Sequence, residues 1–171
     1  HRYILIPIFV FLIIFSSVTF AKKAAIVIDF DTKEVLFEVN ANTKNYPASL
    51  TKIMTLYILF DQIEKGLLTY ETKLKVSKIA SSRSPSKLYL EADSYIRVKD
   101  AIMALIIKSA NDVATVVAEN ISGTEKEFAK LMTRYARNLG MSKTTFKNAS
   151  GLPNRAQLTT ARDISILSHA L

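Results

Sequence analysis

The pattern of apolar and polar residues divides the chain into a short strand-like part and a long helical part. An apolar run at residues 24–30 and a partly alternating run at 34–39 flank a polar turn, which predicts a β-hairpin. From residue 49 onward, apolar residues recur mostly at the spacing of helices. A strand pair followed by a helical block predicts the α+β fold class.

The helix predicted to begin near Ser49 is apolar on most of its sides and ends at Gly66. Such a helix is usually buried, so we expect it at the centre of the helical part. Its dipole favours negative charge near Ser49. A capping box at residues 124–127 predicts the start of another helix. Helices are predicted over residues 98–107, 113–119, 125–139 and 160–171, with interruptions at 109–112 and 148–153, and residues 73–95 receive no assignment.

The predicted sheet is too small to be stable by itself, because two strands alone make a marginal sheet. The sequence also stops inside an apolar helix that has no capping residue. We therefore expect part of an antiparallel sheet only, with the fold incomplete at the C-terminus.

The first residues have the pattern of a secretory signal peptide. Arg2 precedes an apolar run at residues 3–15, and small residues follow at Thr19 and Ala21. This predicts a signal peptide over residues 1–21 and a domain over residues 22–171, located outside the cytoplasmic membrane in the periplasm. The alternative is an uncleaved membrane anchor, because the run to Ala21 is just long enough to span a bilayer.

Composition narrows the possible chemistry and partners. The formal charge is +8, but the lysines are dispersed and no arginine cluster is present, so we expect no nucleic-acid partner. Attraction to an anionic polymer or membrane surface fits the same charge. The chain has no cysteine, which excludes disulfides and thiolate metal sites, and its only histidines are His1 and His169. We expect neither a metal site nor another cofactor.

Ser49 and Lys52 are the strongest candidates for catalytic residues. They lie three positions apart at the start of the predicted central helix, so their side chains share a face. A serine becomes a good nucleophile only when a nearby base takes its proton, and with so little histidine that base would be Lys52. Periodicity alone leaves a second interpretation open, in which Ser49 caps the helix and Lys52 only buries its stem.

Two further strings contain serine with a possible partner. Ser84 and Lys87 repeat the Ser-x-x-Lys spacing, but they lie in a serine-rich stretch with Pro85, which predicts a solvated loop. Ser109 and Asn111 lie in a short break between apolar helices, where a hydroxyl and an amide can relay a proton or hold a substrate carbonyl. An ordinary helix-capping turn is the alternative for the second string.

Taken together, these strings resemble the serine D-alanyl-D-alanine carboxypeptidases, which are penicillin-binding proteins of low molecular mass. The resemblance covers about residues 24–171. It implies a β-lactamase/transpeptidase-like fold, formed by a helical block and an antiparallel sheet. It rests on residues 47–55 (Pro-Ala-Ser-Leu-Thr-Lys-Ile-Met-Thr) and 108–112 (Lys-Ser-Ala-Asn-Asp), with support from residues 139–141, 145–146, 151–152 and 160–163.

The resemblance also implies roles for four residues. Ser49 would attack the terminal D-Ala–D-Ala bond of a peptidoglycan stem peptide, as part of cell-wall biogenesis and the control of cell shape. Lys52 would be the general base, Ser109 would pass the proton to the leaving amine, and Asn111 would bind substrate or orient Lys52. The Ser49 amide would be one of two oxyanion donors. β-Lactams would act as covalent inhibitors at the same serine.

One element of the family pattern is missing. The third motif, Lys-[Ser/Thr]-Gly, does not occur, and the nearest string at residues 143–145 lacks the glycine, so we interpret it as a loop. We therefore expect this chain to be impaired or inactive when isolated. Asp163 is interpreted as structural.

Three other functions remain as alternatives. A penicillin-binding endopeptidase shares the same motifs. A class A β-lactamase would have Asp where Ala110 stands, and it would need a deacylating glutamate that Glu119, Glu125 and Glu127 do not supply at the right spacing. A non-catalytic remnant that binds the cell wall would explain the missing third motif.

Overall fold

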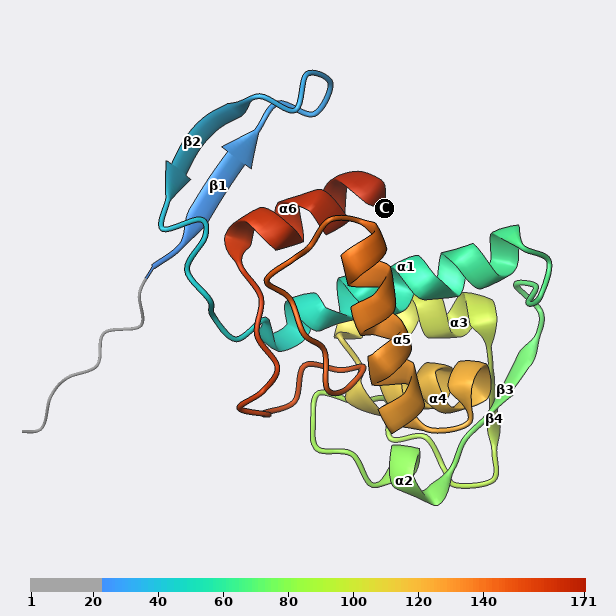
Figure 1. Ribbon diagram of the computed structural model, residues 1–171. Coiled ribbons are helices and arrows are strands. Elements are labelled where there is room, and N and C mark those ends of the chain that lie inside the picture. The colour runs from blue at the N-terminus through green and yellow to red at the C-terminus, as the bar shows by residue number, and fades with distance from the viewer. Residues whose placement is uncertain (1–22) are drawn as a thin grey trace, which may run out of the picture.

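A computed structural model describes residues 23–171 of the chain (Figure 1). The predicted signal peptide lies outside the described residues. The predicted hairpin is present, with β1 (Ala25–Ile28) antiparallel to β2 (Val35–Val39). Its turn is closed by Asp29, whose Oδ1 accepts hydrogen bonds from the N–H of Thr32 at 2.7 Å and from its hydroxyl at 2.9 Å.

The helical body is built around α1 (Thr51–Glu64), which follows the short 3₁₀-helix η1 (Ala48–Leu50). This helix packs against α4, α5 and α6, and half of its residues are buried and nearly all the others partly buried, as its apolar circumference predicts (Figure 1). The other elements of the body are α2 (Lys78–Ser81), α3 (Val98–Met103), the π-helix η2 (Ala104–Lys108), α4 (Asn111–Ser122), α5 (Glu125–Asn138) and α6 (Ala161–Ala170).

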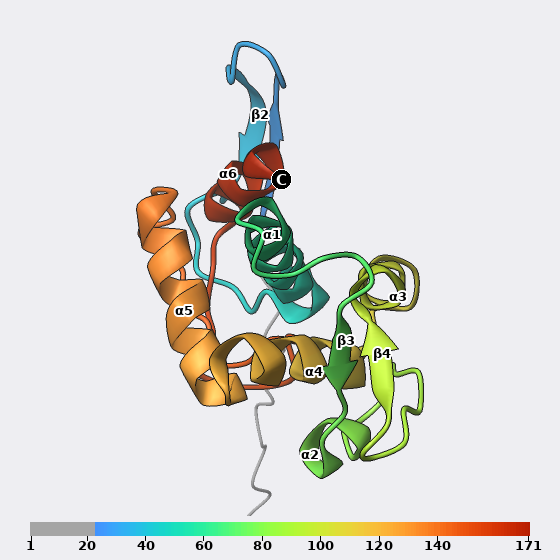
Figure 2. The same cartoon turned by 90° about the vertical axis from the view of Figure 1, so that its right-hand side faces the viewer.

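A second, very small sheet is present that the sequence pattern did not predict. It consists of β3 (Lys73–Lys75) and β4 (Tyr95–Arg97), paired antiparallel at the other end of the molecule from the hairpin (Figure 2). Only the central residue of each strand, Leu74 or Ile96, is buried. Three residues are too few to produce a recognisable alternation, which explains why residues 73–95 received no assignment.

The helix starts follow the predicted capping chemistry. Thr124 Oγ1 accepts the N–H of Glu127 at 3.2 Å, and Thr160 Oγ1 accepts the N–H of Asp163 at 3.0 Å. The Asp163 carboxylate also accepts the Thr144 hydroxyl at 2.7 Å. Asp163 is therefore structural, as expected, and residues 143–145 form the loop that it holds.

The last helix returns the chain to the hairpin. Arg162 pairs with Glu38 of β2, and the ring of His169 stacks on Phe30 with 4.9 Å between centroids. Backbone hydrogen bonds join Asn45 and Thr159 in both directions. The segment that leads to Ser49 is thereby tied to the start of α6. No helix among residues 23–171 is long and apolar enough to cross a membrane.

Candidate active site

Three of the four predicted site residues line one groove. Ser49 lies in η1 with its side chain exposed, and Lys52 lies in the first turn of α1. Ser109, at the end of η2, lines the same open groove of about 610 Å³. The chain segments that carry these side chains are far apart in sequence, and the packing of α1 against α4 brings them together.

The amine of Lys52 is buried and held by two carbonyl oxygens. The residue is 3% exposed. Its Nζ donates to Asn111 Oδ1 at 2.8 Å and to the backbone carbonyl of Ser150 at 2.7 Å. No carboxylate among the described residues pairs with it. Burial lowers the pKa of Lys52 to about 8.

This arrangement suits the neutral amine. A neutral amine has two N–H groups and one lone pair, whereas an ammonium has three N–H groups and no acceptor. The carbonyl oxygens of Asn111 and Ser150 take up two N–H groups of Lys52. In the neutral form the lone pair is then left over to accept a proton. In the part of the chain that the structure describes, Ser49 makes no hydrogen bond to Nζ of Lys52. It lies one helical turn before Lys52 and lines the same groove.

The orientation of the Asn111 amide is fixed by the loop around Pro85. Asn111 Nδ2 donates to the carbonyl of Ser84 at 2.9 Å, which directs Oδ1 toward Lys52. The backbone N–H of Asn111 donates to the carbonyl of Ser86 at 2.7 Å. The prediction of a solvated loop is confirmed, since Ser84 and Pro85 are exposed, and two carbonyls of this loop also position Asn111.

Ser109 occupies an unusual position on the backbone. Its φ of 53° and ψ of 43° place it in the left-handed region, at the end of the π-helix η2. π-Turns and left-handed non-glycine residues occur frequently at functional sites. The predicted interruption over residues 109–112 is shorter than expected, since Asn111 already begins α4.

The neighbouring residue Asp112 has a structural contact. Its buried carboxylate accepts the N–H groups of Leu88 and Leu90 and so holds the loop that contains them.

No motif in the sequence predicted the contribution of residues 149–151 to the site. The Ser150 carbonyl holds Lys52, and the Ala149 carbonyl accepts the Thr55 hydroxyl at 2.7 Å. Both act through the backbone, so the identity of their side chains gives no signal of their role. Only the string at 151–152, quoted for the family resemblance, pointed to this region.

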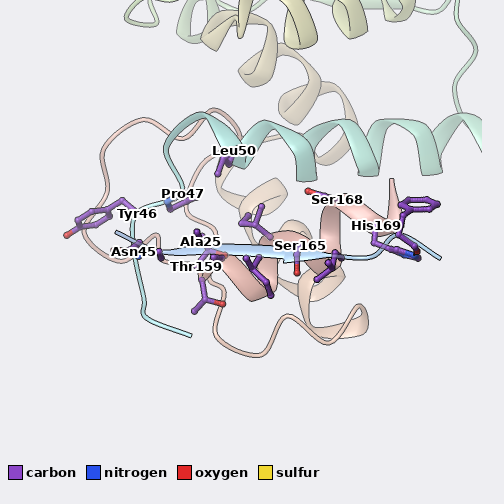
Figure 3. Close-up of a pocket in the computed structure, with 16 residues that line it drawn as sticks. Ala25, Asn45, Tyr46, Pro47, Leu50, Thr159, Ser165, Ser168 and His169 are labelled. Atoms are coloured by element: carbon purple, nitrogen blue, oxygen red, sulfur yellow. The ribbon is translucent and has the colours of Figure 1, made fainter. Parts of the chain in front are cut away.

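A second cavity lies on the hairpin side of the same region (Figure 3). It has a volume of about 500 Å³ and lies between β1, residues 45–50 and α6. Leu50 and Pro47 line it, with His169 at one end. None of the four predicted site residues belongs to its lining. We therefore place the candidate active site in the groove at Ser49 rather than here.

Comparison with known proteins identifies the family. The family model described as D-alanyl-D-alanine carboxypeptidase matches residues 14–171. The chain therefore belongs to the D-alanyl-D-alanine carboxypeptidase family, a family of serine peptidases, and the resemblance inferred from the motifs is confirmed. It is similar to the D-alanyl-D-alanine carboxypeptidase DacF of Bacillus subtilis, with 36% identity over 156 residues.

Solved structures confirm the predicted fold. The crystal structure of the D-alanyl-D-alanine carboxypeptidase DacD from Francisella tularensis has a TM-score of 0.84 and 37% identity over 86% of this chain. A penicillin-binding protein of Listeria monocytogenes, in its ampicillin-bound form, has a TM-score of 0.75 and 32% identity over 85% of this chain. The chain spans 40% of the Bacillus relative, 36% of the Francisella chain and 59% of the Listeria chain.

Proposed function

We propose that this chain carries the acylation chemistry of a serine-type D-alanyl-D-alanine carboxypeptidase. The observation that supports this most directly is the Lys52 amine, which is buried, has a pKa lowered to about 8 and is held by two carbonyl oxygens. A lysine in that state is a base suited to neutral pH. It lies one helical turn from the exposed hydroxyl of Ser49, in the same groove.

The reaction would proceed in two stages. Lys52 takes the Ser49 proton while Ser49 Oγ attacks the carbonyl carbon of the terminal D-Ala–D-Ala bond. The tetrahedral adduct collapses, the C–N bond breaks and the released D-alanine amine takes, through Ser109, the proton that Lys52 holds, which restores the neutral Lys52 amine. Water then attacks the acyl-serine ester, giving the shortened peptide and regenerating the Ser49 hydroxyl.

The negative charge of the adduct needs donors, and the backbone of Ser49 can supply one. No acceptor within residues 23–171 bonds its N–H. This N–H lies near the N-terminal end of α1, where the helix dipole favours negative charge. Asn111 holds Nζ in place, and we propose that it also contacts the substrate amide.

The substrate class follows from the family. A peptidoglycan stem peptide ending in D-Ala–D-Ala is the proposed substrate, and β-lactams are the proposed covalent inhibitors, as the ampicillin-bound relative suggests. Such a substrate lies outside the cytoplasmic membrane. The proposal therefore agrees with the secretion signal predicted from residues 1–21.

Covalent labelling with a fluorescent penicillin tests the proposal. Because the Lys-[Ser/Thr]-Gly motif is missing from this sequence, we expect acylation to be slow, but a single acyl adduct should form on the chain, visible by intact-mass spectrometry, and none on Ser49→Ala. Lys52→Met should lower the labelling rate by about 10²-fold or more, because the general base is lost. Lys87→Met, in the second Ser-x-x-Lys string, is the matched control and should label normally. Equal labelling of the chain and Ser49→Ala, or no adduct on either, would contradict the proposal.

A further inference from the structure

The turn at residues 148–151 is built rigidly from within. Asn148 Oδ1 accepts the N–H of Gly151 at 2.7 Å, and Asn148 Nδ2 donates to the carbonyl of Leu152 at 2.8 Å. The buried side chain of Gln157 accepts the N–H groups of Lys147 and Asn148 at 2.8 and 3.1 Å. With every one of these groups satisfied, the turn has little freedom to move.

This turn contacts the nucleophile region at its final residue as well as through the carbonyls of residues 149 and 150. Gly151 lies directly against the peptide bond between Ala48 and Ser49. A Cβ at position 151 would be 1.8 Å from the Ala48 carbonyl oxygen, 2.4 Å from the Ala48 carbonyl carbon and 3.1 Å from the Ser49 nitrogen. All three atoms belong to the backbone, so no side-chain rotation could relieve the clash.

The backbone on the other side of this contact is itself strained. Ala48 has a φ of +47°, in the left-handed region that a residue with a Cβ rarely adopts. Such a conformation persists only where the surroundings enforce it. The close approach of Gly151 is one contact that restricts the direction of the Ala48–Ser49 peptide, and with it the direction of the Ser49 N–H.

We propose that Gly151 is a positioning residue for the nucleophile. Because it has no side chain, the Ala48–Ser49 peptide can pack directly against its Cα, and this contact holds the Ser49 N–H in place as an oxyanion donor. The inference rests on the proposed acylation chemistry and adds a residue to it. The same turn holds Lys52 through the Ser150 carbonyl. One rigid segment thereby sets the relative position of the base and the oxyanion donor.

Gly140 provides a matched control for the test. Gly140 and Gly151 have the same φ of +89°, but a Cβ at Gly140 meets nothing within 4 Å. Gly140→Ala therefore introduces the backbone strain alone, whereas Gly151→Ala introduces the same strain together with the collision. Any difference between the two variants reports the contact with Ala48.

Two measurements separate positioning from general damage. In ¹H–¹⁵N spectra, we expect the Ser49 amide resonance to move in Gly151→Ala and to stay in place in Gly140→Ala. In penicillin labelling, we expect Gly151→Ala to acylate about tenfold more slowly or worse, and Gly140→Ala to stay within about twofold of the unchanged chain. A Ser49 resonance that is unmoved in Gly151→Ala, with acylation within twofold, would overturn the inference.

The spectra decide the inference even where acylation is absent. If the unchanged chain takes no penicillin, the proposed function fails, while the Ser49 resonance still reports whether Gly151 positions the Ala48–Ser49 peptide.

A second substitution covers the case in which Gly151→Ala does not fold. Ala48→Gly is then added to it, because glycine lets that peptide turn away from the new methyl group. We expect the double variant to fold and to show a displaced Ser49 amide. A double variant no better folded than Gly151→Ala would contradict a contact with Ala48.

Discussion

At the scale of single residues, Lys52 shows how surroundings lower the pKa of an ordinary side chain. An exposed lysine is almost entirely protonated at neutral pH. Burial against α4 and residues 149–151 disfavours the charge, and the two acceptors around Nζ are neutral carbonyls rather than carboxylates. A carboxylate in either place would have favoured the protonated amine.

The pH dependence of acylation follows from that environment. In the proposed mechanism the neutral amine is the active form, and with a pKa of about 8 its fraction increases as the pH rises through that value. At pH 7 about one amine in ten is then neutral. We expect the penicillin acylation rate to rise about tenfold between pH 7 and pH 9 and to level off above. An inflection near pH 10.5, the ordinary lysine range, would contradict this.

Asn111→Asp tests whether the neutral amide beside Lys52 sets the pH of this inflection. A carboxylate 2.8 Å from Nζ would stabilise the ammonium, so the inflection should move upward by about one pH unit or more. The position of the inflection is the informative quantity, because a merely structural defect lowers the rate without moving it. Titration of the Lys52 Nζ by ¹⁵N NMR gives the same comparison without turnover.

The sequence could reveal the side chains of this site but not its backbone. Ser49, Lys52, Ser109 and Asn111 were identified because a hydroxyl, an amine and an amide at short spacing indicate chemistry. The backbone carbonyls of Ser84 and Ser150 could not be identified in this way, since every residue has a backbone carbonyl. Their importance becomes visible only when the fold places them against Asn111 and Lys52.

At the scale of elements, a partly buried ion pair connects helix α5 to the loop before the site. Glu125 pairs with Arg83, and its other oxygen accepts the N–H of Ala149 at 3.1 Å. The side chains are 14% and 28% exposed, so water can compensate only in part if one partner is removed. Glu125 thus holds the first residue of the 149–151 segment.

Glu125→Ala should therefore destabilise the fold. We expect the free energy of unfolding to fall by about 2 kcal/mol, because Arg83 and the Ala149 N–H lose a charged acceptor. Urea denaturation followed by circular dichroism measures the change. Lys130→Ala removes an exposed ion pair from the same helix and should change stability by less than about 0.5 kcal/mol. Equal losses of unfolding free energy in the two variants would show that the partly buried pair stabilises the fold no more than the exposed pair does.

The elements that the sequence predicted well are those whose pattern extends over several turns or is closed by a cap. The central helix α1 and the capped helices α5 and α6 belong to this group. The three-residue strands β3 and β4 are too short to have a pattern. The π-helix η2 has apolar residues that look like a continuing α-helix, because the widened turn depends on backbone hydrogen bonds rather than on residue type.

At the scale of the whole molecule, the hairpin projects from the helical body (Figure 2). Within residues 23–171, α6 packs against β1 and its Arg162 pairs with Glu38 of β2, while every residue of β2 remains exposed. Large apolar side chains are exposed on one face of it, where Val27, Phe37 and Val39 are 49%, 55% and 41% exposed. Contiguous exposed apolar surface of this kind binds apolar ligands readily.

An apolar fluorescent dye should detect this surface. We expect the folded chain to enhance anilinonaphthalene sulfonate fluorescence and Phe37→Lys to reduce the enhancement by about half. Leu67→Lys is the matched control, since Leu67 is 67% exposed but lies outside the hairpin. It adds the same charge and should leave the signal unchanged. Equal reduction in both variants would point to charge repulsion of the dye instead of the hairpin surface.

The direction in which Ser109 points depends on how many residues the π-helix η2 contains. Each helical residue turns the chain by about 100°, so losing one residue from Ala104–Lys108 could leave a regular α-helix while rotating Ser109 away from Lys52. Exchanging one apolar residue of this stretch for another would not alter that angle. Evolution of this stretch would therefore be free in composition but fixed in length, and insertions or deletions there would mark descendants that had abandoned the chemistry.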